Sequence, residues 1–231
     1  MAGQNLQKVD VDGLGVGYQR AGEGAPLVLL HGFFGDSRVW RPQLEGLRDS
    51  FAVVAWDAPG AGRSADPPET FRLAEYADRL ASFIELLGLK QPYVVGLSFG
   101  AALALELFRR HPEVPRALVL AGAYAGWAGS LPPEVVEQRL RQTILDLDLP
   151  ADHVVTKYIP GLLTQDAPVD VVSEVAAIMR DFHPTGMKAM TRSLAEADLR
   201  DVLPRIDVPA LLLYGEHDVR SPLTVARDLH S

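Results

Sequence analysis

The sequence VVGLSFGAA at residues 94–102 decides the fold of this chain. A short apolar run, residues 93–95, leads into its Gly-Leu-Ser-Phe-Gly core, and an alanine- and leucine-rich segment, residues 101–110, follows. This order predicts a buried strand that passes through a sharp turn into a helix. The glycines stand where a Cβ would collide with the neighbouring strand and helix. The stretch indicates a nucleophile elbow that exposes the Ser98 Oγ at the helix N-terminus; the alternative is a serine in an ordinary glycine-containing turn.

Composition bounds the class of protein. The 231 residues are 48% hydrophobic and 23% charged, which suits one globular core. The net charge of −8 and the lack of a Lys/Arg run argue against nucleic acid and anionic membranes as partners. With no cysteine, the sequence excludes disulfides, thiolate metal sites and a cysteine nucleophile. No apolar stretch matches a signal peptide or a membrane span, so we expect a cytoplasmic protein.

Strand and helix patterns alternate along much of the chain. A short hairpin is expected over residues 6–18 and a helix over residues 71–87, which Gly88 ends. Buried strands are expected at residues 27–30, 51–56, 117–121 and 210–214. This alternation predicts an α/β fold: a mostly parallel sheet with helices on both faces.

The loop at residues 31–35, His-Gly-Phe-Phe-Gly, follows the first of these buried strands. In a parallel sheet such a loop opens at the carboxyl edge, where ligands bind. We expect the Phe33 N–H to be the first oxyanion donor and the Phe99 N–H, next to Ser98, to be the second. The alternative is a plain glycine turn. The His31 side chain is expected to hold the loop rather than to transfer protons.

Two aspartates are candidates for a catalytic acid. Asp57 ends the strand 51–56 before a Pro-Gly turn, and turn chemistry explains it as well, so we interpret Asp57 and Arg63 as stabilising that loop. Asp218 follows the strand 210–214 at the same sheet edge and would accept the Nδ1–H of a catalytic histidine. A turn-forming aspartate is the alternative there. Glu216 is a weaker candidate than Asp218 for the catalytic acid.

Residues 124–198 break the pattern, because they contain helical segments with many prolines and no buried strand. The sequence therefore predicts a core formed by residues 1–123 and 199–231 and a helical lid formed by residues 124–198. Some apolar lid residues are candidates for lining a substrate pocket beneath the lid, with lid packing as the alternative. They are Tyr124, Trp127, Tyr158, Met179 and Met187.

Together, the loop 31–35, the segment 57–64, the elbow at 96–100 and the segment 215–218 resemble the α/β-hydrolase superfamily. The likeness is to the lid-bearing branch with carboxylesterases, enol-lactonases and cofactor-free haloperoxidases. It implies the α/β-hydrolase fold, Ser98 as nucleophile, and an apolar ester or lactone of small size as substrate. It implies no metal and no organic cofactor. Ser98 counts against the dehalogenases and epoxide hydrolases of that branch, which use aspartate there.

The resemblance also implies a catalytic histidine beyond one further helix and strand after Asp218. Only thirteen residues follow Asp218, and we expect none of the six histidines to take that place. We therefore expect a chain whose last strand and helix are missing, in preference to natural loss of the histidine. Such a chain would be nearly inactive and could self-associate through an exposed edge strand, residues 210–214. Two other functions stay open: a haloperoxidase that acts through a peracid at Ser98, and a non-catalytic ligand-binding protein.

Overall fold

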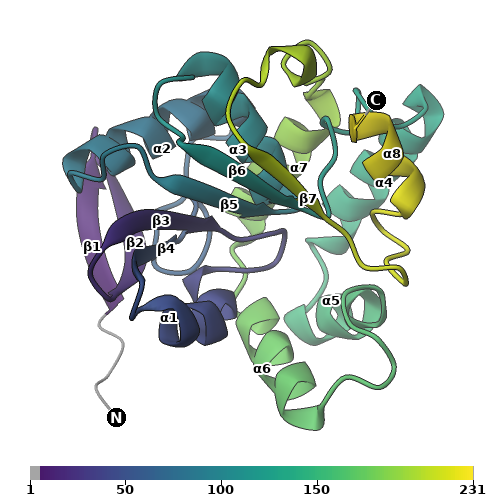
Figure 1. Ribbon diagram of the computed structural model, residues 1–231. Coiled ribbons are helices and arrows are strands. Elements are labelled where there is room, and N and C mark those ends of the chain that lie inside the picture. Colours follow the sequence, from purple (N-terminus) through teal and green to yellow (C-terminus); the bar gives the residue numbers. More distant parts are fainter. Residues whose placement is uncertain (1–5, 231) are drawn as a thin grey trace.

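The computed structural model describes residues 6–230, in which seven strands form a single sheet (Figure 1). Their order across the sheet is β1-β2-β4-β3-β5-β6-β7. The first two strands form an antiparallel hairpin, β2 is antiparallel to β4, and all later neighbours are parallel. The mostly parallel sheet is therefore confirmed. The strands are β1 (Leu6–Val11), β2 (Leu14–Ala21), β3 (Ala25–Leu30), β4 (Phe51–Trp56), β5 (Tyr93–Leu97), β6 (Ala117–Ala121) and β7 (Ala210–Leu213).

Helices cover both faces of the sheet (Figure 1). A short 3-10 turn, η1 (Ser37–Trp40), and α1 (Arg41–Leu47) bury Trp40 and Leu44 against β3 and β4. On the opposite face, α2 (Leu73–Leu86) and α3 (Phe99–Arg110) pack together and form the main apolar core with the sheet. Burial on both faces explains why β3 and β4 are continuous apolar runs.

Only helices and turns separate β6 from β7 in the described chain. The arrowheads of β6 and β7 point toward the side of the molecule where α5 lies (Figure 1). The helices and turns between these strands are α4 (Pro133–Asp146), α5 (Ala151–Tyr158), η2 (Ile159–Gly161), α6 (Val169–Arg180), α7 (Pro184–Glu196) and the turn η3 (Leu203–Arg205). Two of these helices, α4 and α7, begin at a proline, and two, α5 and α6, begin directly after one.

The strand β7 lies at the edge of the sheet and pairs only with β6 within residues 6–230. Leu211 and Leu213 are each 57% exposed, so the apolar edge strand expected from the sequence is present. The last helix, α8 (Leu223–His230), buries Val225. Across the described residues, none of the helices has the length and apolarity that a membrane span requires.

Candidate active site

Ser98 occupies the turn between β5 and α3. Its backbone lies at φ 52° and ψ −107°, a region that non-glycine residues rarely adopt, and it precedes the first turn of α3. Such strain costs about 1–3 kcal/mol and persists only where the surroundings hold it. The Ser98 N–H donates to the Ala121 carbonyl oxygen of β6 at 2.8 Å, which ties the turn to the neighbouring strand.

The two glycines of the pentapeptide allow this turn. A Cβ on Gly96 would overlap the Gly100 carbonyl, and a Cβ on Gly100 would overlap the Leu30 carbonyl of β3. These glycines therefore allow β5, α3 and β3 to approach one another closely, as the sequence pattern predicts.

The loop after β3 lies against the elbow. A Cβ built on Gly32 would be 3.5 Å from the Cβ of Ser98 and 3.2 Å from the Leu97 carbonyl oxygen. Phe33 follows Gly32 and Phe99 follows Ser98, so the two expected oxyanion donors belong to segments in contact. Phe34, the next residue, has a positive φ of 61° and is buried. The structure thus brings the two loops together.

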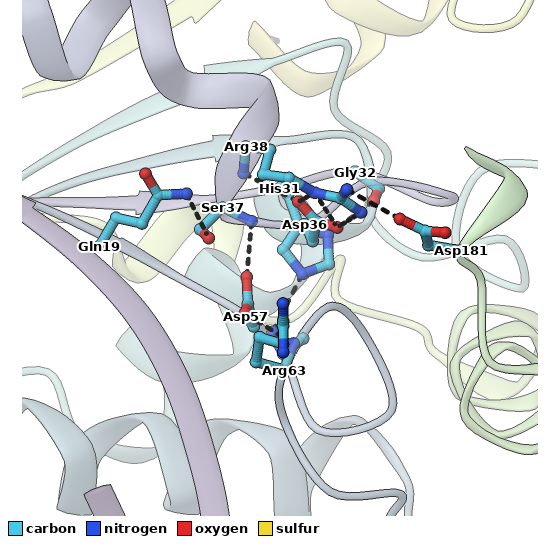
Figure 2. Close-up of polar contacts among 10 residues, drawn as sticks. Gln19, His31, Gly32, Asp36, Ser37, Arg38, Asp57, Arg63 and Asp181 are labelled. Carbon is cyan, nitrogen blue, oxygen red and sulfur yellow. Dashed lines mark hydrogen bonds and ion pairs between the residues drawn. The ribbon is translucent and has the colours of Figure 1, made fainter. Parts of the chain in front are cut away.

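His31 holds this loop in place (Figure 2). Its Nε2 accepts the Ala58 N–H at 3.0 Å, so the ring proton is on Nδ1, which donates to the Gly32 carbonyl oxygen at 2.8 Å. Both ring nitrogens are occupied and the side chain is buried. The expectation that His31 is structural is confirmed.

Asp57 is also structural (Figure 2). One carboxylate oxygen accepts the Ser37 N–H at 2.7 Å and the other accepts the Arg63 N–H at 2.9 Å. The Asp57 side chain is buried, so this carboxylate links η1 to the loop after β4. The interpretation that Asp57 and Arg63 stabilise the loop is confirmed, and Arg63 contributes its backbone N–H.

Ser98 follows β5 and Asp218 comes after β7, and β6 lies between these two strands in the sheet. Its Oδ1 accepts the Arg220 N–H at 2.8 Å and the Ser221 N–H at 2.9 Å, which forms the turn that sequence reasoning kept as its alternative. A Cβ built on Gly122 would lie 3.6 Å from Asp218 Oδ2, and Gly122 directly follows the residue that accepts the Ser98 N–H. Asp218 therefore forms the turn through Oδ1 while Oδ2 lies beside Gly122, the residue after β6.

No histidine in the described part of the chain forms a hydrogen bond or ion pair with Ser98 or Asp218. His111 pairs with Asp78 and His183 pairs with Asp66, both at 2.8 Å. His217 lies 3.4 Å from Glu216, and both side chains are largely exposed. Across residues 6–230, the structure supplies no partner imidazole for the Asp218 carboxylate. The same residues contain no group of three or more histidine, aspartate or glutamate side chains that could hold a metal ion.

The five pocket candidates fall in different places. The Tyr158 ring packs 4.9 Å from that of Phe34, and its hydroxyl donates to Asp146 at 2.7 Å. Burial, helped by Asp146, raises the pKa of Tyr158 to about 12. Met187 lines a small crevice with Phe34. The Tyr124 hydroxyl donates to the Arg220 carbonyl oxygen.

Met179 is buried in the main core, and Trp127 packs partly buried against the same core. Tyr158 and Met187 belong to the same core and also lie beside Phe34 in the loop after β3, and Tyr124 reaches the loop after β7.

Arg38 is a feature of the site that sequence reasoning missed. Its guanidinium pairs with Asp36 at 2.6 Å in the loop after β3 and with Asp181 at 2.8 Å beyond α6 (Figure 2). The Asp36 hydrogen bond raises the pKa of Arg38. Arg38 therefore ties the loop beside Ser98 to the helical segment, which is the part of the chain between β6 and β7. Asp181 is 143 positions away, so local sequence carries no signal for this pair.

The arrangement of strands, elbow and loops defines the class. Residues 25–148 match the family described as alpha/beta hydrolase fold, which is more than half of the chain. The chain belongs to the α/β-hydrolase fold family, and it is a hydrolase of that fold.

Named relatives include the pimeloyl-[acyl-carrier protein] methyl ester esterase of Vibrio cholerae. It is 31% identical over 219 residues, which cover 92% of this chain and 84% of the relative. A thermophilic esterase from Thermogutta terrifontis has a TM-score of 0.86 at 27% identity, over 97% of this chain and 85% of that one. The enol-lactonase from Burkholderia xenovorans shares the fold, with a TM-score of 0.87 at 24% identity, over 96% and 86% of the chains.

Proposed function

We propose that the chain is a serine hydrolase that acts on a small carboxylic ester or lactone through an acyl-enzyme at Ser98. The observation that carries this proposal is the strained Ser98 at the start of α3, in contact with the Gly32 loop and across the edge from Asp218. An esterase and an enol-lactonase among the similar proteins support the same reaction class.

In the proposed reaction, a base takes the proton of Ser98 Oγ as that oxygen attacks the substrate carbonyl carbon. The N–H groups of Phe33 and Phe99 stabilise the oxyanion. The bond to the leaving alcohol breaks, and the protonated base gives its proton to that alcohol. Water then cleaves the acyl-serine ester and releases the acid, again with the base accepting and returning a proton.

Asp218 would hold the base as an imidazole whose Nδ1–H points to Oδ2. Because no described histidine hydrogen-bonds to Asp218, we expect the 231-residue chain to turn over esters hardly faster than background. The loss of a catalytic histidine costs on the order of a millionfold in kcat in serine hydrolases.

The remaining parts of the proposal concern the surroundings of Ser98. We infer that residues 124–198 act as a lid on a core formed by residues 1–123 and 199–231, and that Tyr124, Trp127, Tyr158, Met179 and Met187 enclose an apolar substrate between them. The outer residues of this division, 1–5 and 231, lie outside the described part. We also propose a cytoplasmic location and self-association through β7.

Chemical rescue tests the proposal on the chain as it exists. Free imidazole should raise p-nitrophenyl butyrate hydrolysis about tenfold or more over the Ser98→Ala variant, because general-base catalysis contributes that much or more. Ser50→Ala, which truncates an exposed serine before β4, is the matched control and should behave like the unchanged chain. Equal rates for Ser98→Ala and the unchanged chain at every imidazole concentration would disprove the proposal.

A further inference from the structure

Arg220 lies in the loop between β7 and α8, two residues after Asp218, and its backbone is held on both sides. Its N–H donates to Asp218 Oδ1 at 2.8 Å, and its carbonyl oxygen accepts the Tyr124 hydroxyl. Figure 1 shows this loop beside α5. The position of the Arg220 Cα is therefore fixed next to the proposed catalytic acid.

The Arg220 side chain fits a seat formed by the helical segment. The guanidinium carbon lies 5.2 Å from the centre of the Tyr158 ring, and Nε donates to the Gly161 carbonyl oxygen at 3.1 Å. A Cβ built on Gly161 would lie only 2.8 Å from Nε and 3.0 Å from Nη2. The absence of a side chain at Gly161 thus makes room for the guanidinium.

The charge of Arg220 is compensated only in part, by the field of the nearby Asp218 carboxylate. No carboxylate in residues 6–230 forms an ion pair with it, and its Nη atoms have no acceptor among those residues. Arginines nearby are paired, for example Arg38 with Asp181 and Arg41 with Glu174. Arg220 therefore differs from Arg38 and Arg41, because a carboxylate pairs with each of those two.

The charge of a second cation, Arg139, acts on Arg220. Arg139 of α4 has no ion pair within the described chain. Desolvation lowers the pKa of Arg220, and the charge of Arg139 lowers it further. Repulsion between like charges is unfavourable, and a bound anion would relieve it.

This cation lies close to the reaction centre. The Tyr158 ring that carries the guanidinium also packs 4.9 Å from the Phe34 ring. Phe34 directly follows Phe33, the proposed oxyanion donor. A single aromatic ring therefore separates Arg220 from the oxyanion loop.

We propose that Arg220 binds an anionic group of the substrate, so that the substrate is an ester or lactone that carries a carboxylate away from the scissile bond. The inference rests on the proposed function of Ser98. The planar guanidinium fork suits a carboxylate, which it can bind through two parallel hydrogen bonds. A chain of net charge −8 repels anions in general, so a local cation is what would admit one.

Binding measurements test this without relying on turnover. We would titrate the chain by calorimetry with the monomethyl and dimethyl esters of succinate, glutarate and adipate, which differ in charge at matched length. The unchanged chain should bind at least one monomethyl ester about tenfold or more tightly than its dimethyl counterpart, as a charge-assisted hydrogen bond provides. Arg220→Gln should abolish this preference and leave dimethyl ester binding unchanged.

Two further variants make the result specific. Gly161→Ala keeps the charge but displaces the guanidinium, so it should reduce the preference. Arg227→Gln removes an exposed arginine of α8 and should leave the preference intact. The proposal is overturned if the unchanged chain prefers no monomethyl ester, or if Arg220→Gln retains the preference.

Failure of the proposed function gives a different pattern. Ser98→Ala should keep the preference for the monomethyl ester, because it leaves Arg220 in place. A retained preference together with no imidazole-dependent, Ser98-dependent hydrolysis would contradict catalysis but not anion binding.

Discussion

Asp57 shows how one residue can connect the two loops that support the site. Its two carboxylate oxygens accept N–H groups from Ser37 and Arg63, and its own carbonyl oxygen accepts the Ser64 hydroxyl at 2.6 Å. Ser37, Asp57 and Ser64 are buried, and the hydrogen bond from the Arg63 N–H is partly buried. Removing one acceptor leaves a desolvated N–H without a partner, which costs more than a hydrogen bond contributes on average.

The substitution Asp57→Asn replaces one acceptor oxygen by an NH₂ group, which faces either the Ser37 or the Arg63 N–H. We expect it to lower the free energy of unfolding by about 1–3 kcal/mol, measured by urea denaturation. Asp181→Asn, at an exposed position, is the control and should change stability far less. An Asp57→Asn variant as stable as the unchanged chain would refute the structural assignment.

Among the secondary-structure elements, α4 and α5 are joined by a single buried carboxylate. Asp146, at the end of α4, accepts hydrogen bonds from the Lys157 ammonium at 2.7 Å, the Tyr158 hydroxyl at 2.7 Å and the Gln142 amide at 2.9 Å. Burial of Asp146 favours its neutral form, but the hydrogen bonds from Lys157, Tyr158 and Gln142 outweigh burial and lower its pKa. The ionised form therefore holds Tyr158 in place.

This pKa shift predicts a pH dependence of stability. Since the pKa of Asp146 is lower in the folded chain than its ordinary value of 3.8, its contribution is complete above that value. The contribution is lost as the pH falls through the folded-state pKa. Asp146→Asn should be less stable by about 1–3 kcal/mol at pH 6, and the difference should shrink toward pH 3, in thermal melts. A difference that is constant between these pH values would rule out this origin.

At the scale of the whole molecule, the sheet within residues 6–230 ends on β7, an apolar strand that pairs on one side only. Unpaired N–H and C=O groups and exposed leucines on β7 offer a template for pairing with another chain. The net charge of −8 opposes association at long range but is screened by salt.

We expect concentration-dependent self-association that increases with salt, measured by sedimentation velocity. Replacing both Leu211 and Leu213 by lysine should abolish it, because charges block strand pairing at an edge. Leu86→Lys, at a 54% exposed position of α2, is the control and should not. A chain that stays monomeric at all concentrations would argue against association through β7.

Local sequence was sufficient for features whose cause lies within a few residues. The elbow at Ser98 follows from two glycines between an apolar run and a helix, and the helix stop at Gly88 follows from its positive φ of 65°. The pairing of Arg38 with Asp181 and the seat of Arg220 on Gly161 escaped sequence reasoning. Both join segments far apart in the chain, and no periodicity marks such partners.

By itself, the sequence determined the order of strands and helices, the strained serine turn and the open apolar strand, because each depends on local patterning of glycines and apolar residues. Only the tertiary structure decided that His31 and Asp57 are fully occupied by backbone groups, that no described histidine hydrogen-bonds to Asp218, and that Arg220 lies beside Tyr158 with no ion pair within residues 6–230. Those outcomes depend on which distant groups meet at the sheet edge, and packing rather than sequence spacing sets those meetings.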